Sequence, residues 1–272
     1  MRREREGGRA LILEGKTVVV TGVGSGLGSE IVRCAHRDGA NVMLAARTQK
    51  NLEAVADEVA PTGERIAWKT ADVTDGDACD SLFDAAIDRF GRIDALVNVA
   101  ALDTVFGGIF DTPVDAWRKT FEVNVFGLAT LVRSAAEHMK DPGVKGGRSI
   151  VLIGSQSSEL PGPSQVAYAS SKGALMTAMK FMANELGPLG IRVNTVIPTW
   201  MWGPPVQAYV RGAAKQRGVT EDEVLAEIVA KMPLGEMPAD DDVAEAVVFF
   251  CSDRARMITG QSLLVNAGEL MP

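Results

Sequence analysis

Short apolar runs rich in β-branched residues alternate with longer amphipathic stretches along most of this chain. Apolar runs of this kind are expected of strands in a parallel sheet that helices cover on both faces. The stretches between them carry apolar residues on one side at helical spacing. The pattern predicts an α/β fold with strands at 16–21, 41–46, 65–70, 94–98, 148–154, 191–197 and 262–265, and helices at 29–38, 52–59, 78–90, 114–138, 163–186, 221–232 and 240–251.

Residues 199–235 interrupt this alternation, apart from the helix predicted at 221–232. Trp200 and Trp202 stand beside two prolines just after a strand, a pattern typical of a lid or pocket wall, with an aromatic patch for subunit packing as the alternative. No internal repeat or linker is visible. We therefore expect residues 13–272 to form a single domain with a substrate lid at about 199–235, preceded by a charged, disordered arm at 1–12.

The composition narrows the function classes. Hydrophobic residues make up 46% and charged residues 23% of the 272 residues, which are ordinary values for a globular protein. The net charge of −7 argues against a nucleic-acid surface. No apolar run approaches the roughly 18 residues of a membrane span, and no secretory h-region follows the charged start. The three cysteines are scattered and odd in number, so we expect a cytoplasmic protein with no metal site.

A glycine-rich turn, Gly22-Val-Gly-Ser-Gly-Leu-Gly28, lies between the first predicted strand and the first predicted helix. Glycines at this place permit a tight turn and let the backbone approach a pyrophosphate. The free N–H groups and the dipole at the helix N-terminus favour an anion there. The context therefore predicts a dinucleotide site, while a turn used only for close packing is the alternative.

The end of the second predicted strand bears on which dinucleotide is bound. Arg47 and Thr48 stand where an acidic residue would accept hydrogen bonds from the adenosine ribose. An arginine fits a 2′-phosphate, so NADP(H) is favoured, with NAD(H) as the other candidate. Arg47 as a solvated charge or a group stacked on adenine is the alternative. Asp72 follows the third predicted strand and is placed equally well to meet an adenine amino group or to cap the next helix.

Tyr168 and Lys172 are four residues apart on a predicted helix, so they project from one face. A lysine ammonium there would favour the tyrosinate, which matters because a phenol is a poor proton acceptor at neutral pH. Such a pair is weak evidence for catalysis by itself.

Ser155 ends the fifth strand and is placed either to donate to a carbonyl oxygen or to cap a turn. Asn124, an amide in an apolar stretch, must find hydrogen bonds locally or order a water. His36 and His138 are expected to be solvated.

Taken together, these segments resemble the short-chain dehydrogenase/reductase family from about Leu13 to the end of the chain. The matching pieces are Thr21 to Gly28, Asp72-Val73, Asn98-Val-Ala-Ala101, Asn124, Ser155, Tyr168-Ala-Ser-Ser-Lys172, Asn194, Pro198, and Gly260-Gln with Asn266-Ala-Gly268. Ser155 precedes Tyr168 by thirteen residues, as the family has it. The resemblance implies a single-domain Rossmann fold, a doubly wound seven-stranded parallel sheet in the order 3-2-1-4-5-6-7 with helices on both faces.

The resemblance also implies roles. Tyr168 is the general acid in carbonyl reduction and the base in alcohol oxidation, and Lys172 lowers its pKa and holds the nicotinamide ribose. Ser155 binds the substrate oxygen, and Asn124 holds a water that relays protons to Lys172. The cofactor is expected at Gly22, Gly24, Ser25, Gly26, Leu27, Gly28, Arg47, Thr48, Asp72, Val73, Asn98, Ala100, Tyr168, Lys172, Pro198 and Thr199. The substrate pocket is expected at Ser155, Ser157, Tyr168, Trp200 and Trp202.

The chain departs from the family at three places. The family's Asn-Asn-Ala-Gly after the fourth strand is here Asn98-Val-Ala-Ala101, so the local turn differs. Thr199 replaces the usual glycine after Pro198. Gly203 stands where the family commonly has a threonine that grips the nicotinamide carboxamide, a task that Thr199 or a backbone group would take over. None of these departures touches the four predicted catalytic residues.

The sequence therefore favours an NAD(P)-dependent oxidoreductase that interconverts a secondary alcohol and a ketone. The apolar lid and the loop 102–110 favour an uncharged, fairly bulky substrate, alicyclic or steroid-like. Reduction of a 3-oxoacyl thioester is the second hypothesis, with Arg211, Lys215 and Arg217 either meeting a phosphopantetheine carrier or forming a solvated helix face. A catalytically silent cofactor-binding regulator is the third. Family habit implies a homotetramer or homodimer, packed partly through the helices that carry Asn124 and Tyr168.

Overall fold

The structure is a computed structural model that describes residues 11–140, 147–162 and 165–271. Residues 1–10, most of the predicted arm, lie outside the described residues, as do the first two residues of the helix predicted at 163–186. Ile12, also assigned to that arm, packs against a buried apolar cluster, and Leu13 is fully buried. The folded core thus begins at Ile12 and Leu13, within the segment predicted to be an arm.

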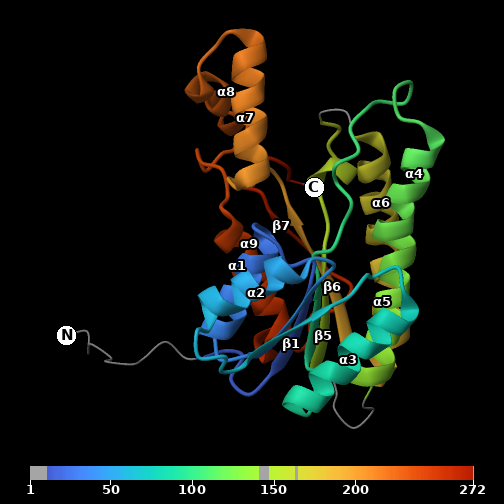
Figure 1. The fold of residues 1–272 in the computed structure, drawn as a ribbon. Helices are drawn as coiled ribbons and strands as arrows, with labels where there is room; N and C mark the ends of the chain where they lie inside the picture. Colours follow the sequence, from blue (N-terminus) through green and yellow to red (C-terminus); the bar gives the residue numbers. More distant parts are fainter. Residues whose placement is uncertain (1–10, 141–146, 163–164, 272) are drawn as a thin grey trace.

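A parallel sheet of seven strands forms the middle of the molecule (Figure 1). Its order is β3-β2-β1-β4-β5-β6-β7, and every neighbouring pair is parallel, which confirms the fold predicted from the sequence. The carboxyl ends of all strands therefore meet at one edge. The strands are β1 (Thr17–Thr21), β2 (Asn41–Ala46), β3 (Ile66–Thr70), β4 (Ala95–Asn98), β5 (Arg148–Ile153), β6 (Ile191–Pro198) and β7 (Ser262–Val265).

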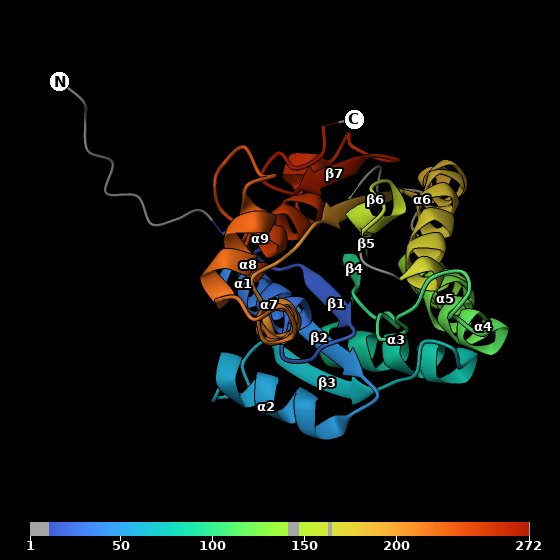
Figure 2. The ribbon, with the colours of Figure 1, turned by 90° about the horizontal axis from the view of Figure 1, so that it is seen from above.

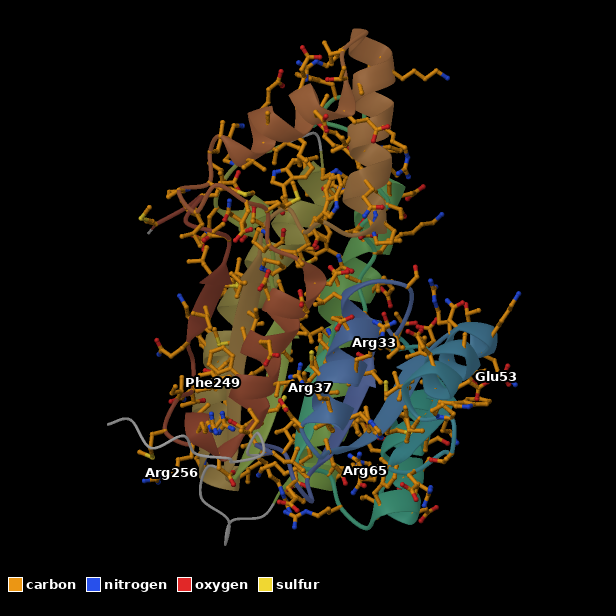
Figure 3. The ribbon with its side chains drawn as sticks, turned by 90° about the vertical axis from the view of Figure 1, so that its left-hand side faces the viewer. Arg33, Arg37, Glu53, Arg65, Phe249 and Arg256 are labelled. Atoms are coloured by element: carbon orange, nitrogen blue, oxygen red, sulfur yellow. The ribbon has the colours of Figure 1, made fainter. Side chains whose placement is uncertain are left out.

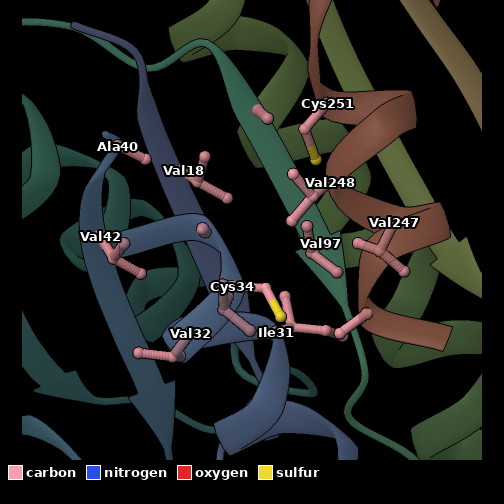
Figure 4. Close-up of a cluster of buried hydrophobic side chains, with 14 of the residues drawn as sticks. Val18, Ile31, Val32, Cys34, Ala40, Val42, Val97, Val247, Val248 and Cys251 are labelled. Carbon is pink, nitrogen blue, oxygen red and sulfur yellow. The ribbon is translucent and has the colours of Figure 1, made fainter. Parts of the chain in front are cut away.

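Helices cover both faces of this sheet (Figure 2). One layer contains α1 (Leu27–Arg37), α2 (Gln49–Val59) and α9 (Asp240–Cys251), and the other contains α3 (Gly76–Phe90), α5 (Leu128–Met139) and α6 (Val166–Leu186). Side chains of a strand point alternately to the two faces, so Val18 and Val20 belong to one apolar cluster and Val19 to the other. Figure 4 shows how α1 and α9 fill the first cluster against β1, β2 and β4.

Two ion pairs supplement the first layer on its outer side. The side chains of Arg33 and Arg37 both extend from α1, and Figure 3 shows them on the outer side of this helix. Arg33 binds Glu58 of α2 at 2.9 Å, and Arg37 binds Glu245 of α9 at 2.8 Å. Such exposed pairs contribute roughly 0–1 kcal/mol each, so the buried apolar contacts remain the main source of stability for this layer.

The stretch 114–138 is not one continuous α-helix, and that prediction was wrong in its middle. It consists of α4 (Val114–Phe121), a π-helix η1 (Glu122–Gly127) and α5. Gly127 fits tightly here, because a Cβ on it would lie 3.2 Å from the Glu122 carbonyl oxygen and from side chains of Val73 and Thr74. The wider π-helical turn contains Asn124, and π-bulges are frequent at functional sites.

The segment predicted to be a substrate lid contains a helix that the sequence analysis missed. The helix α7 (Pro204–Arg217) begins with two prolines, which need no hydrogen-bonded N–H in a first turn. It ends at Gly218, and α8 (Glu221–Val229) follows, starting with a capping box between Thr220 and Glu223. The two helices pack on each other and stand above the carboxyl edge of the sheet (Figure 1). Their shared apolar cluster contains Val210, Ala214, Val224, Ile228 and Met232.

Two glycines of the glycine-rich turn differ in the space around them, because a side chain would clash at Gly22 but not at Gly24. This difference allows a test of the fold. Gly22 has a φ of +79°, and a Cβ on it would lie 2.3 Å from the Ala100 backbone nitrogen. A Cβ on Gly24 would meet nothing within 4 Å. We expect Gly22→Ala to lower the free energy of unfolding by about 3 kcal/mol or more. Gly24→Ala is the matched control and should leave it within about 0.5 kcal/mol in urea denaturation; equal effects would contradict the close contact at Gly22.

Candidate active site

Tyr168 and Lys172 lie one turn apart on α6, beside the carboxyl end of β5. The Lys172 side chain is buried, with 3% of the residue exposed. Its Nζ donates a hydrogen bond of 2.6 Å to the carbonyl oxygen of Ile153, the last residue of β5. The same Nζ lies 5.6 Å from the centroid of the Tyr168 ring. The pair therefore sits at the strand ends and not on a solvated helix face.

The surroundings keep Tyr168 protonated. Burial raises the pKa of Tyr168 to about 12, a hydrogen bond with the Ser155 side chain opposes this shift, and the charge of Asp103 adds to it. The sequence prediction that Lys172 lowers the pKa of the phenol is not met in this structure. The physical reason is that burial dominates, and the Lys172 ammonium is directed at Ile153.

Burial acts on Lys172 in the complementary direction. It lowers the pKa of Lys172 to about 8, and the charge of Asp103 opposes the shift. Asp103 itself is exposed, and its backbone carbonyl accepts a hydrogen bond of 2.8 Å from Gln165, next to the start of α6. An acidic group thus acts on both members of the pair, and sequence reasoning missed it because only the fold brings it there.

Asn124 connects the π-helix to two other segments. Its Oδ1 accepts from the Leu102 N–H at 2.7 Å, and its Nδ2 donates to the Leu102 carbonyl at 3.1 Å and to Ser171 Oγ at 2.9 Å. Both amide hydrogens are therefore used within the protein. The sequence left two roles open for Asn124. The structure shows the local hydrogen bonds, and the water relay stays a prediction.

Ser155 makes the turn-capping contact, one of the two alternatives that the sequence left open, and donation to a substrate carbonyl oxygen stays a prediction. Its side chain caps the short 3-10 helix η2 (Gln156–Ser158) by accepting from the Ser157 N–H. It also lies 2.8 Å from Ser157 Oγ and forms the hydrogen bond with Tyr168 described above. The structure thus brings Ser155, Ser157, Tyr168 and Lys172 together at the end of β5.

The glycine-rich turn lies at the same edge of the sheet, at the N-terminus of α1. Gly26 is the N-cap residue and has no side chain to bond the free N–H groups of the first turn. Gly28 has no room for a side chain, since a Cβ would lie 2.6 Å from the Gly22 carbonyl oxygen. Ser25 is exposed, and Leu27 is buried. Open space beside Gly24 and free donors at a helix start together form a cradle for an anion.

Arg47 and Asp72 follow neighbouring strands, β2 and β3. Arg47 is exposed, like Thr48 after it, at the start of α2. Hydrogen bonds from the backbone and side chain of Thr74 lower the pKa of Asp72, burial opposes this, and the charge of Arg47 adds to the lowering. The N-cap of α3 is Asp75, so Asp72 does not serve as the cap that the sequence offered as an alternative.

The other residues predicted to bind a cofactor lie along this edge. Asn98 ends β4, and its Oδ1 accepts from Thr21 Oγ1 at 2.7 Å. Ala100 approaches Gly22 closely, and Val73 is buried next to Asp72. Pro198 ends β6, and the hydroxyl of the following Thr199 donates to the carboxylate of Glu269. Sequence reasoning missed Glu269, whose only signal was its position directly after Asn266-Ala-Gly268.

The two tryptophans lie in the segment predicted to be a lid. The Trp200 ring packs on Tyr209 of α7, with 5.0 Å between ring centroids. Trp202 lines a surface pocket together with Leu225, Ala226 and Met237. Their described contacts therefore include α7, α8 and residues 236–239 after the predicted lid, and contact with a substrate stays a prediction.

The histidines and the acidic side chains add no second site. His36 contacts the Glu64 carbonyl oxygen, and His138 contacts the Ser134 carbonyl oxygen and Asp84 on the protein exterior. In the part of the chain that the structure describes, no cluster of His, Cys, Asp and Glu is arranged to hold a metal ion. Over the same residues, no helix combines the length and the apolar character needed to cross a membrane.

The buried Lys172 leads to a prediction about stability. Because the pKa of Lys172 is lowered to about 8 in the folded protein, the unfolded chain binds more protons between about pH 8 and its ordinary value of about 10.5. The free energy of unfolding should therefore rise with pH across this window relative to Lys172→Met, and the difference should be flat below it. Urea denaturation of both proteins without cofactor, at pH 7 and at pH 9.5, measures this. A difference that does not change with pH would contradict the burial of the ammonium.

Comparisons with known proteins agree with this geometry. The sequence pattern of a family described as Enoyl-(Acyl carrier protein) reductase matches residues 22–269. L-rhamnose 1-dehydrogenase (NAD(P)(+)) of Azotobacter vinelandii is 33% identical over 95% of this chain and 98% of its own length. 3beta-hydroxysteroid dehydrogenase 1 of Eggerthella lenta is 32% identical over 94% of both chains.

A solved structure extends the agreement to the fold. The crystal structure of a short-chain dehydrogenase/reductase, glucose/ribitol dehydrogenase, from Brucella melitensis superposes with a TM-score of 0.84 and 27% identity, covering 97% of this chain and 100% of that one. The matched sequence contains β2 to β7 and all four predicted catalytic residues. The chain belongs to the short-chain dehydrogenase/reductase family.

Proposed function

We propose that this protein is an NADP(H)-dependent oxidoreductase that interconverts a secondary alcohol and a ketone by hydride transfer. One observation carries the proposal: Tyr168 is hydrogen-bonded with Ser155 and lies one turn from the buried Lys172, at the strand ends beside an open glycine-rich turn. This arrangement offers a proton donor and a second donor for a carbonyl oxygen next to a dinucleotide cradle. The names of the relatives support the reaction class.

The residues present fit a dinucleotide. The close-packed Gly22 and Gly28 shape the turn, while the space beside Gly24 and the free N–H groups of α1 would take the pyrophosphate. Lys172 would hold the nicotinamide ribose, and Asn98, Ala100 and Pro198 would line the cofactor path. When bound, the reduced nicotinamide supplies the hydride.

The preference for NADP(H) rests on Arg47. Its guanidinium is exposed at the end of β2, close enough to Asp72 for its charge to lower the pKa of that carboxyl. An arginine in this position can bind a 2′-phosphate in a bidentate manner, whereas an acidic residue would select the unphosphorylated ribose.

In ketone reduction, the protonated phenol of Tyr168 donates its proton to the carbonyl oxygen, and the Ser155 hydroxyl donates a hydrogen bond to the same oxygen. Tyr168 is then left as the tyrosinate. Alcohol oxidation needs the tyrosinate at the start. Because burial raises the pKa of Tyr168 to about 12, oxidation should accelerate with rising pH, while reduction proceeds at neutral pH.

The substrate that this site favours is uncharged, apolar and fairly bulky. The loop 102–110 leads from β4 to the mouth of the site and carries strongly exposed apolar side chains, Phe106 at 71%, Ile109 at 67% and Phe110 at 98%. Gly107 of this loop pairs with Gln165 at the start of α6, so the loop lies beside Tyr168. Such a surface suits an alicyclic or steroid-like ketone better than a sugar.

Two alternatives are less well supported. A 3-oxoacyl thioester reductase would need free cations for a phosphopantetheine carrier, but Arg217 is paired with Glu227 at 2.5 Å and Asp103 places negative charge near the site. Arg211 and Lys215 stay candidates on α7. A silent cofactor-binding regulator would not need Ser155, Tyr168 and Lys172 in contact.

We also propose a homodimer or homotetramer in the cytoplasm. Exposed apolar side chains on α4, η1 and α6, among them Val114, Phe126 and Phe181, support packing through the helices that carry Asn124 and Tyr168. The cysteines Cys34, Cys79 and Cys251 are free and buried, as suits a reducing compartment.

Tyr168→Phe tests the proposed chemistry. It removes only the phenolic hydroxyl, so turnover of a ketone found by screening cyclic ketones, steroids and acyl thioesters should fall by roughly 10²–10⁴-fold. The affinity for NADPH, measured by its fluorescence, should change less than about threefold, because the ring and Lys172 remain. Turnover that survives the substitution would refute the role of Tyr168.

Arg47→Ala tests the cofactor preference. Loss of a bidentate contact with a 2′-phosphate should weaken NADPH binding by roughly 10- to 100-fold and leave NADH binding unchanged. Lys50→Ala is the matched control, an exposed cation three residues further on in α2. If the wild-type protein prefers NADH, or if both variants behave alike, the assignment of Arg47 is wrong.

A further inference from the structure

The segment after β7 returns to the edge of the proposed active site. The Glu269 carboxylate accepts a hydrogen bond of 2.8 Å from Gln156 Nε2, and the same oxygen accepts from Thr199 Oγ1. Asn266 Nδ2 donates to Gln156 Oε1 at 2.7 Å and to the Leu270 carbonyl at 2.9 Å. Both ends of the Gln156 amide are therefore held by this segment.

The two partners of Glu269 flank the site. Gln156 directly follows Ser155, and Thr199 directly follows Pro198 at the end of β6. Gln156 and Asn266 are buried, with 4% and 5% exposed, so the network is not a solvated surface contact. One carboxylate thus links the segment after β5 to the segment after β6.

The contact with Glu269 also fixes what Thr199 can do. A hydroxyl has one hydrogen, and that of Thr199 is donated to Glu269, so its oxygen can only accept from a further partner. A primary amide N–H₂ is the kind of donor that such an acceptor takes. The nicotinamide carboxamide is the one amide of this kind on the proposed cofactor.

Position 203, where the family resemblance implies a threonine for this task, is crowded. A Cβ on Gly203 would lie 3.0 Å from Asp240 Oδ2 and 3.3 Å from Oδ1. The Asp240 carboxylate at the start of α9 would have to move aside for a side chain here. Since residue 203 is a glycine, no side chain at this position can accept from the carboxamide, and Thr199 is the candidate at the same edge.

We propose that Glu269 is a positioning residue that acts through Thr199 on the nicotinamide carboxamide and whose charge favours the oxidised cofactor. The inference rests on the proposed use of a nicotinamide dinucleotide. The nicotinamide ring is cationic when oxidised and neutral when reduced, so a nearby partly buried carboxylate stabilises the oxidised form selectively. Glu269 thereby shifts the equilibrium on the enzyme towards NADP⁺ and alcohol, the same direction that the protonated Tyr168 favours.

The test compares the affinities for NADP⁺ and NADPH by isothermal titration calorimetry. Glu269→Gln keeps an acceptor for Gln156 and Thr199 but removes the charge. It should weaken NADP⁺ binding on the order of tenfold more than NADPH binding. Glu185→Gln, the same charge change on an exposed residue of α6, should leave the ratio of the two affinities unchanged.

Two variants of Thr199 test the link through the hydroxyl. Thr199→Val should weaken both cofactor forms by a similar factor, and Thr199→Ser should restore them, because it keeps the hydroxyl. Thermal denaturation of each variant confirms that the fold is retained. If Glu269→Gln binds NADP⁺ and NADPH with the same ratio of affinities as the wild-type protein, the inference is overturned and the proposed function still stands. A wild-type protein that binds neither form would overturn the proposed function, and this inference with it.

Discussion

The hydrogen bond from the buried Lys172 ammonium to the Ile153 carbonyl oxygen joins α6 to the end of β5. Burial of a charge is costly unless it is hydrogen-bonded, so this contact fixes the position of the whole helix turn that carries Tyr168. Ser155 is two residues beyond Ile153, which places its hydroxyl against the phenol. The proposed chemistry thus depends on this contact between a helix and a strand.

A second connection comes from the π-helix η1. Its Asn124 binds the backbone of Leu102 and the hydroxyl of Ser171, so the loop after β4 and the helix α6 share one amide. Ser171 adjoins Lys172, and Leu102 adjoins Asp103, the acidic residue that acts on both Tyr168 and Lys172. Asn124 thereby links the π-helix to the segments that carry Lys172 and Asp103.

The sequence predicted what depends on local pattern. The seven strands follow from apolar periodicity, while their order and the grouping of Ser155, Tyr168 and Lys172 were implied by the family resemblance. The missed features depend on contacts between distant segments. In the π-helix, Asn124 bonds to Leu102 and Ser171, which are distant in the sequence. The helix α7 was missed because it begins with two prolines, which usually end a helix but also suit its first turn. Lys172 was expected to lower the pKa of Tyr168, but burial, which no motif encodes, decides the shift.

The central claim is that hydride and proton reach the substrate by separate routes, from the dinucleotide and from Tyr168. Isotope transfer to a ketone substrate measures this most directly. With NADPH deuterated at the transferring position of C4, in ordinary water, mass spectrometry should find one deuterium on the carbinol carbon of the alcohol. With unlabelled NADPH in D₂O, that carbon should carry none. Carbon-bound deuterium taken from the solvent, or an alcohol without label from the deuterated cofactor, would contradict the account.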